Sequence, residues 1–278
     1  MVKARKRFGQ HFLEPAWVAK LVKALNARPD DPFVEIGPGR GAITRPLAQQ
    51  VYRMLAIEVD RDLAAALEAE QLPTLTVVQG DVLEVDLGAV IEAWQQGPLG
   101  PEHRVRVVGN LPYNISSPIL FMLLRLAAGT GGLIDATLML QREVADRLTA
   151  KPATKEYGVL SILTGLHADV TRLLALPPGA FRPPPQVSSA VVRLAFRPPA
   201  VSLNDEAVFT RMVRTMFTQR RKTLGNALRA FGDATGLEAS AALSAAGIDS
   251  RRRPETLQLV ELARLADVFA SADSRAVL

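Results

Sequence analysis

Short apolar runs alternate with helical patterns over the first two thirds of the chain. A helical face comes first, because apolar residues recur every three or four positions in 14–25. Runs of strand length follow at 33–36, 54–58, 75–79, 105–109 and 136–140, and helical spacing occupies 61–70, 119–126 and 142–148. Strands that alternate with helices predict βαβ units and a mostly parallel sheet.

The pattern changes twice towards the end of the chain. Two more strand-like runs, 170–176 and 190–196, flank a proline-rich loop, which favours a hairpin-like pair at the sheet edge. After Arg197 only helical patterns remain, at 206–217, 222–231, 238–246 and 256–270. The sequence therefore predicts an α/β domain over 1–197 and a small all-α domain over 198–278.

Composition narrows the possible chemistry. The 278 residues are 48% hydrophobic and 22% charged, which is typical of a globular protein, and none of them is cysteine. Disulfides and thiolate chemistry are therefore excluded. The only three histidines (His11, His103 and His167) are far apart, so we expect no metal site.

Charge and hydropathy indicate where the chain acts. A net charge of +5 and a pI near 9.8 favour a polyanionic partner. The basic start is not followed by the apolar segment of a secretory signal. The most apolar run, 118–124, is far too short to cross a bilayer. We therefore expect a cytoplasmic protein with no membrane contact.

A glycine-rich loop follows the first predicted strand and opens a helix. Gly37, Gly39 and Gly41 allow a tight turn and let a ligand approach the backbone closely. Glu58 ends the second predicted strand, where a carboxylate can accept both ribose hydroxyl protons. Together the loop and Glu58 indicate a cofactor that contains a nucleoside.

The loop favours S-adenosylmethionine over a dinucleotide. Its spacing is G-x-G-x-G rather than the G-x-G-x-x-G of pyrophosphate-binding loops, and Pro38 removes one N–H donor. Glu35 would repel a pyrophosphate but suits a cationic group. Asp81, which follows the third predicted strand, can accept from an adenine amino group. The alternative for Asp81 is a turn or helix-capping residue.

The segment Asn110-Leu111-Pro112-Tyr113 follows the fourth predicted strand, at the edge where open α/β sheets bind ligands. An exocyclic adenine nitrogen is a weak nucleophile because its lone pair is delocalised into the ring. The Asn110 side chain and the Leu111 carbonyl, fixed by Pro112, could hold both N6 hydrogens and aim the lone pair at a methyl donor. Tyr113 would stack on the base. The alternative is a proline-containing turn with a buried tyrosine.

The chain resembles a known family, the ribosomal RNA adenine N6,N6-dimethyltransferases. Within this family it resembles the bacterial branch that acts on the small ribosomal subunit. The resemblance spans nearly the whole chain. It rests on residues 6–13 (KRFGQHFL), 34–39 (VEIGPG), 57–60 (IEVD), 80–81 (GD), 109–116 (GNLPYNIS), 181–185 (FRPPP) and 219–223 (QRRKT).

The resemblance implies a fold, a reaction and site residues. It implies a Rossmann-like methyltransferase domain that uses S-adenosylmethionine, and cofactor contacts from six residues: His11, Leu13, Gly37, Glu58, Asp81 and Asn110. It implies base stacking by Tyr113 and Phe181, and the alternative for Phe181 is a side chain that fills the core. The implied substrate is two adjacent adenines in the 3′-terminal hairpin loop of 16S rRNA within an assembling 30S subunit. Each base would leave its stack to reach the site. We expect a monomer.

Two basic clusters are candidates for contact with RNA phosphates. The first is the N-terminal arm Lys3, Arg5, Lys6 and Arg7, and the second is Arg220, Arg221 and Lys222 in the helical region. An ordinary solvated tail or helix face is the alternative for each cluster. For residues 251–253, all arginine, phosphate contact and salt bridging between helices remain equally open.

Three other functions are considered. A macrolide-resistance-type 23S rRNA adenine methyltransferase shares much of this pattern, although 110–115 and 219–222 favour the small-subunit branch. An NAD-dependent oxidoreductase is disfavoured by the loop spacing. A non-catalytic assembly factor is disfavoured by the intact segment from Asn110 to Tyr113.

Overall fold

The computed structural model describes residues 11–273, and the chain divides into two compact units. Unit 1 comprises the residues up to Ala145 together with Ala168–Pro198, and unit 2 comprises Asp146–His167 and the residues from Pro199 onward. The sequence placed 146–167 in the first domain, whereas these residues cluster with unit 2. Functional roles for the two domains stay predictions.

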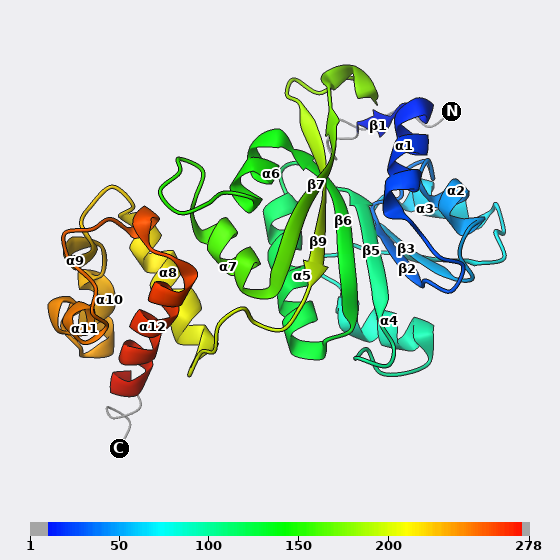
Figure 1. Ribbon diagram of the computed structural model, residues 1–278. Coiled ribbons are helices and arrows are strands. Elements are labelled where there is room, and N and C mark those ends of the chain that lie inside the picture. Colours follow the sequence, from blue (N-terminus) through cyan, green and yellow to red (C-terminus); the bar gives the residue numbers. More distant parts are fainter. Residues whose placement is uncertain (1–10, 274–278) are drawn as a thin grey trace. The chain divides into compact units, whose positions relative to one another are not determined.

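Unit 1 is built on a seven-stranded mixed sheet (Figure 1). Its order is β4 (Leu75–Gln79), β3 (Met54–Glu58), β2 (Phe33–Ile36), β5 (Val105–Asn110), β6 (Leu133–Gln141), β9 (Ser189–Phe196) and β7 (Ala168–Leu176). The first five strands are parallel, and β9 is antiparallel to both β6 and β7. The predicted parallel sheet and the antiparallel pair at its edge are confirmed.

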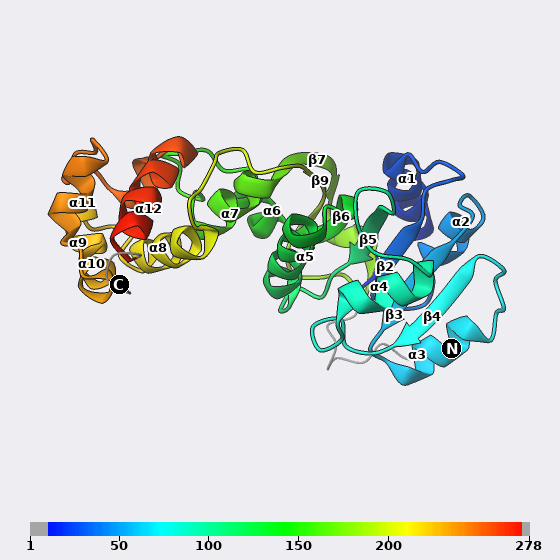
Figure 2. The ribbon, with the colours of Figure 1, turned by 90° about the horizontal axis from the view of Figure 1, so that it is seen from below.

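Helices cover both faces of this sheet. Figure 2 shows α1 (Pro15–Leu25) and α2 (Thr44–Ala48) on one side, and α4 (Leu87–Gln95) and α5 (Ser116–Thr130) on the other. The unit also contains α3 (Arg61–Glu68) and the start of α6 (Arg142–Leu148). Asp60 and Asp86 cap α3 and α4 by accepting backbone N–H groups. The helix predicted after the glycine loop is confirmed by α2, whereas α4 was not predicted.

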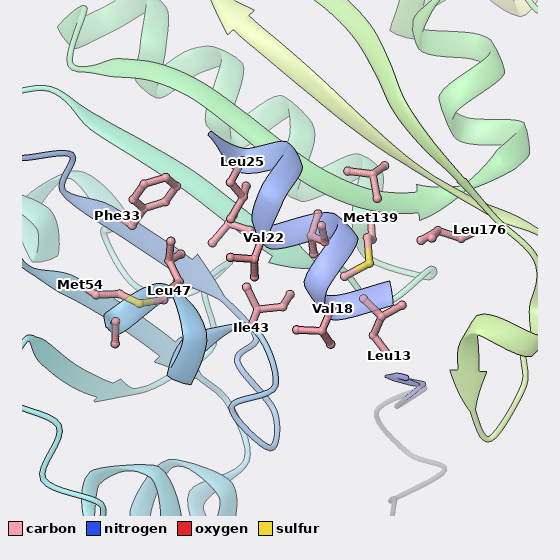
Figure 3. Packing of buried hydrophobic residues seen from close by; sticks show 14 of the residues in the cluster. Leu13, Val18, Val22, Leu25, Phe33, Ile43, Leu47, Met54, Met139 and Leu176 are labelled. Atoms are coloured by element: carbon pink, nitrogen blue, oxygen red, sulfur yellow. The ribbon is translucent and has the colours of Figure 1, made fainter. Parts of the chain in front are cut away.

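A hydrophobic core forms where α1 packs on the sheet. Figure 3 shows side chains of α1, including Val22, over Phe33 of β2, Met54 of β3 and Met139 of β6. Burial of these side chains is the main force that holds α1 in place.

Two guanidinium groups bind the end of α1. Arg106 of β5 donates to the carbonyls of Leu25 and Asn26 and forms ion pairs with Asp31 and Asp135, at 2.7 and 2.8 Å. Arg193 of β9 donates to the carbonyl of Leu25 as well. These donors satisfy carbonyls that a helix leaves unpaired at its C-terminus.

A two-residue strand precedes α1. This strand, β1 (Phe12–Leu13), pairs antiparallel with β8 (Phe181–Arg182), which follows a short 3-10 helix, Pro178–Ala180. Leu13 lies opposite Phe181 in the register. The pairing fixes the backbone that leads from His11 into α1.

Unit 2 is helical, as predicted for the C-terminal region. It contains α7 (Val159–His167), α8 (Glu206–Thr218), α9 (Leu224–Ala227), α10 (Arg229–Thr235), α11 (Ala239–Ala245), a 3-10 helix (Pro254–Thr256) and α12 (Leu259–Asp273). Phe231 and Phe269 meet edge to face in its core, with ring centroids 5.0 Å apart. Contacts distant in sequence add 146–167 to this unit, because the Tyr157 hydroxyl donates to the carbonyl of Leu257.

Within the described residues, no helix has the length and apolar character needed to cross a membrane.

Candidate functional site

A cavity of about 260 Å³ opens at the carboxyl ends of β2, β3 and β5 in unit 1. Its wall contains most of the residues that the sequence singled out: His11, Leu13, Gly37, Glu58, Asp81, Asn110, Leu111, Pro112 and Tyr113. The structure therefore brings together side chains from five separate parts of the chain. The roles assigned to them stay predictions.

The glycine loop and Glu58 form one hydrogen-bonded unit. Gly37, Gly39 and Gly41 all have positive φ, between 57° and 72°, which explains the choice of glycine. The backbone N–H of Gly39 donates to Oε2 of Glu58, and that of Asp60 donates to Oε1, each at 2.9 Å. Burial raises the pKa of Glu58, although these two N–H groups favour its charged form. The carboxylate is thus held in a fixed orientation beside the loop.

Glu35 lies beneath the loop and is fully buried. Its Oε2 accepts from the Thr44 hydroxyl at 2.7 Å. Burial, together with the charge of Glu58, raises the pKa of Glu35 to about 8. At neutral pH the Glu35 carboxyl is therefore mostly protonated in the protein alone, and a cation in the cavity would favour its ionised form.

Asp81 is a turn residue that also lines the cavity, and its contact with an adenine amino group stays a prediction. Its Oδ1 accepts from the backbone N–H of Leu83 at 2.9 Å, so it is a turn residue. Asp81 also lines the cavity. Because a carboxylate has a second oxygen, one side chain can shape the turn and accept from a ligand.

Asn110, the last residue of β5, is oriented by the N-terminal segment. Its Nδ2 donates to the backbone carbonyl of His11 at 2.8 Å. This bond uses the donor side of the amide, so Oδ1 is the atom left to accept hydrogens from a ligand.

Tyr113 is held at both ends. Its hydroxyl lies 2.7 Å from Oγ of Ser189, and its backbone carbonyl accepts from the Ser116 hydroxyl at 3.2 Å. The ring stacks on that of His11, with centroids 5.7 Å apart and planes at 23°. Burial raises the pKa of the Tyr113 hydroxyl. The sequence analysis missed Ser189, which carries no local signal inside β9.

Phe181 requires a correction. It is 1% exposed, packs in the core with Leu13, and is not part of the cavity wall. Stacking on a base requires an accessible ring face, which this placement does not provide. The pairing of β1 with β8 buries the ring, and the sequence alone did not reveal that pairing.

The second basic cluster divides into two kinds of residue. Arg220 pairs with Glu255 at 2.8 Å and donates to the carbonyls of Thr154 and Lys155, so it braces unit 2 internally. A phosphate-binding role for Arg220 is therefore not supported. Arg221 and Lys222 are exposed, as that role requires.

The structure describes some of the other basic residues that the sequence singled out. Arg251 forms a local ion pair with Asp249, two positions away, and Arg252 pairs with Glu261 of α12. Neither pair joins two helices, and phosphate contact stays a prediction. The arm containing Lys3, Arg5, Lys6 and Arg7 lies outside the described residues. Within 11–273, no group of three or more His, Asp or Glu side chains could hold a metal ion.

The chain is similar to known proteins over nearly its whole length. The family model for "Ribosomal RNA adenine dimethylase" matches residues 1–270. "Ribosomal RNA small subunit methyltransferase A" of Acinetobacter baylyi is 46% identical over 270 residues, covering 95% of this chain and 92% of that protein. The protein of the same description from Geobacter metallireducens is 44% identical over 271 residues, covering 95% and 94%.

Two solved structures share the fold across the chain. A dimethyladenosine transferase from Plasmodium falciparum has a TM-score of 0.75 at 23% identity, covering 94% of this chain and 98% of that one. The 23S rRNA methyltransferase ErmE has a TM-score of 0.64 at 25% identity, covering 93% and 99%. The Rossmann-like methyltransferase fold predicted from the sequence is confirmed.

Proposed function

Because the chain belongs to the ribosomal RNA adenine dimethylase family, we propose that it methylates N6 of two adjacent adenines in 16S rRNA. The methyl donor is S-adenosylmethionine, and the products are two N6,N6-dimethyladenosines in the 3′-terminal hairpin loop. The observation that carries this proposal is the orientation of Asn110, whose amide oxygen is available at the carboxyl end of β5.

The residues of the cavity fit this cofactor. Glu58 lies at the end of β3 with its carboxylate fixed by two N–H groups, which suits it to accept ribose hydroxyl protons. Asp81 retains an oxygen for the adenine amino group. Glu35 lines the cavity below the loop, and a cationic group beside it would favour its ionised form. When bound, S-adenosylmethionine supplies an electrophilic methyl group on a positively charged sulfur.

The chain itself orients the target nitrogen. Oδ1 of Asn110 and the carbonyl of Leu111 accept the two N6 hydrogens, which favours a tetrahedral nitrogen with its lone pair directed at the methyl carbon. Pro112 restricts the backbone that carries the second acceptor. Tyr113 stacks on the flipped base. Orientation of this kind can lower a barrier by several kcal/mol without a nucleophilic residue.

The partner and the cellular site follow from the substrate. The chain acts as a monomer on 16S rRNA in the assembling 30S subunit, in the cytoplasm. Exposed Arg221 and Lys222 support contact with RNA phosphates.

Each of the three alternative functions is disfavoured by a separate observation. The relatives at 44–46% identity are small-subunit enzymes by description, whereas the 23S enzyme ErmE is 25% identical. The G-x-G-x-G spacing of the glycine loop, in which Pro38 removes one N–H donor, disfavours a dinucleotide. An assembly factor without activity would have no need for the Asn110 geometry.

The test is methyl transfer to ribosomal subunits. Purified protein is incubated with methyl-labelled S-adenosylmethionine and with 30S or 50S subunits that lack the modification. We expect label in 16S rRNA of the 30S subunit. Label in 23S rRNA instead, or in neither RNA, would overturn the proposal.

A further inference from the structure

We propose that Ser189 is a positioning residue for the methyl transfer, because its hydroxyl holds the far end of the Tyr113 ring on which the target base stacks. This inference rests on the proposed function. It adds a residue outside the glycine loop and outside the segment from Asn110 to Tyr113.

Ser189 is well suited to act as a fixed reference point. It is the first residue of β9, is 2% exposed, and lies opposite Gln141 of β6 on one side and Leu176 of β7 on the other. A strand paired on both sides holds its backbone firmly. The position of the Ser189 hydroxyl is therefore set by the sheet rather than by the loop that carries Tyr113.

The Tyr113 ring needs such a reference point. Tyr113 follows β5 in a turn, and its side chain can swing about the Cα–Cβ bond unless the far end of the ring is held. The 2.7 Å contact between its hydroxyl and Oγ of Ser189 holds that end, 76 residues away in the sequence. The Ser116 hydroxyl fixes the other end through the Tyr113 carbonyl. These two hydrogen bonds fix the axis of the ring, and the stack on His11 limits rotation about that axis, so the ring has one orientation when the base arrives.

Through this hydrogen bond to Tyr113, Ser189 influences where the reacting nitrogen lies. A base that stacks on Tyr113 places N6 according to the plane of that ring, and N6 must reach Oδ1 of Asn110. Misplacement of reacting groups by about 1 Å can lower a rate by a large factor. Loss of the Ser189 hydroxyl should therefore act on methyl transfer through Tyr113, and not through the cofactor.

The test is a double-mutant cycle with Ser189→Ala, Tyr113→Phe and the double variant. Each single change removes the same hydrogen bond, so we expect each to lower kcat/KM for the 30S substrate about three- to tenfold, the size expected for one neutral hydrogen bond. The double variant should fall no further than the single variants. The KM for S-adenosylmethionine should stay unchanged in all three.

A matched control separates positioning from simple loss of stability. Ser161 of α7 is also a buried serine, and its hydroxyl donates to the carbonyl of Arg147 away from the cavity. Ser161→Ala should lower the melting temperature without changing kcat/KM of the folded protein. Equal loss of kcat/KM in Ser161→Ala and Ser189→Ala, or additive effects in the cycle, would overturn the inference.

A second measurement does not depend on turnover. A 30S substrate that carries 2-aminopurine in place of a target adenine reports stacking by its fluorescence in the absence of S-adenosylmethionine. We expect Ser189→Ala to change this emission relative to the wild type, and Ser161→Ala to leave it as in the wild type. An unchanged emission in Ser189→Ala would contradict the inference. If wild-type protein fails to methylate the 30S subunit at all, the proposed function fails instead.

Discussion

The Nδ2 atom of Asn110 donates to the backbone carbonyl of His11 across 2.8 Å, although 99 positions separate the two residues. The N-terminal segment thereby selects which face of the amide is available in the cavity. An amide held by its donor presents its acceptor, and an acceptor is what the two hydrogens of an adenine amino group require.

Asn110→Ala should abolish methyl transfer. Asn110 provides the only side-chain acceptor proposed for N6, so its loss falls mainly on the transition state and on kcat. Rate measurement with saturating 30S subunits checks this, and calorimetry should show that most affinity for S-adenosylmethionine remains. Asn204→Ala, an exposed asparagine in unit 2, serves as the control. A kcat close to that of the wild type would rule out the role assigned to Asn110.

Asp81→Ala should weaken cofactor binding. A hydrogen bond to a charged group contributes about 1.5–3 kcal/mol, so we expect a roughly 10- to 100-fold higher Kd for S-adenosylmethionine. Asp86 provides a matched control, because its Oδ1 also accepts a backbone N–H (of Ala89) but Asp86 does not line the cavity. If Asp81→Ala and Asp86→Ala lose stability alike and both bind the cofactor normally, Asp81 is only a turn residue.

Glu35 should make the folded protein less stable as the pH rises. Its pKa is about 8 in the folded protein and 4.5 in the unfolded chain, so the folded state binds the extra proton. The stabilisation is complete below pH 4.5 and is lost as the pH rises to about 8. The slope is about 1.4 kcal/mol per pH unit at most.

Urea unfolding at several pH values between 5 and 8 measures this effect. Glu35→Gln keeps an acceptor for Thr44 but cannot ionise, so the free energy of unfolding should depend less on pH than in the wild type. Glu70→Gln removes an exposed carboxylate whose pKa is lowered by Arg45, and should leave the slope unchanged over this range. The same slope in Glu35→Gln and in the wild type would refute the assignment.

Replacing Arg221 and Lys222 together with Gln should reduce the salt dependence of subunit binding. Each lost phosphate contact lowers the log–log slope by about 0.9, taking duplex DNA as a guide, so the decrease is up to ~2. Binding to 30S subunits at several salt concentrations measures it.

Arg220→Gln is the comparison for this experiment. It breaks the ion pair with Glu255, so we expect a lower melting temperature with an unchanged salt slope. A reversed pattern, with the slope altered only by Arg220→Gln, would contradict the assignment.

The sequence allowed prediction of features whose causes are local. The parallel strands follow from apolar runs of strand length, and the glycine loop from residues that tolerate positive φ. The cavity residues follow because parallel strands bring their carboxyl ends to one edge of the sheet, so Glu58 and Asn110 had to lie near Gly37.

Other features depend on tertiary contacts and could not be predicted in this way. The burial of Phe181 results from the pairing of β1 with β8, two strands of two residues each. The bracing role of Arg220 depends on carbonyls of Thr154 and Lys155, more than sixty positions away. The contact between Ser189 and Tyr113 likewise needs the order of strands in the sheet, which periodicity does not specify.

Nucleoside analysis of the modified RNA tests most directly whether the protein dimethylates N6 of two adjacent adenines in 16S rRNA. Unmodified 30S subunits are treated with the protein and S-adenosylmethionine, the 3′-terminal hairpin of 16S rRNA is excised, and its nucleosides are quantified by mass spectrometry. We expect two N6,N6-dimethyladenosines per hairpin, at adjacent positions, and none after treatment with Asn110→Ala. Methylation at another atom or another site, or dimethyladenosine formed equally well by Asn110→Ala, would contradict it.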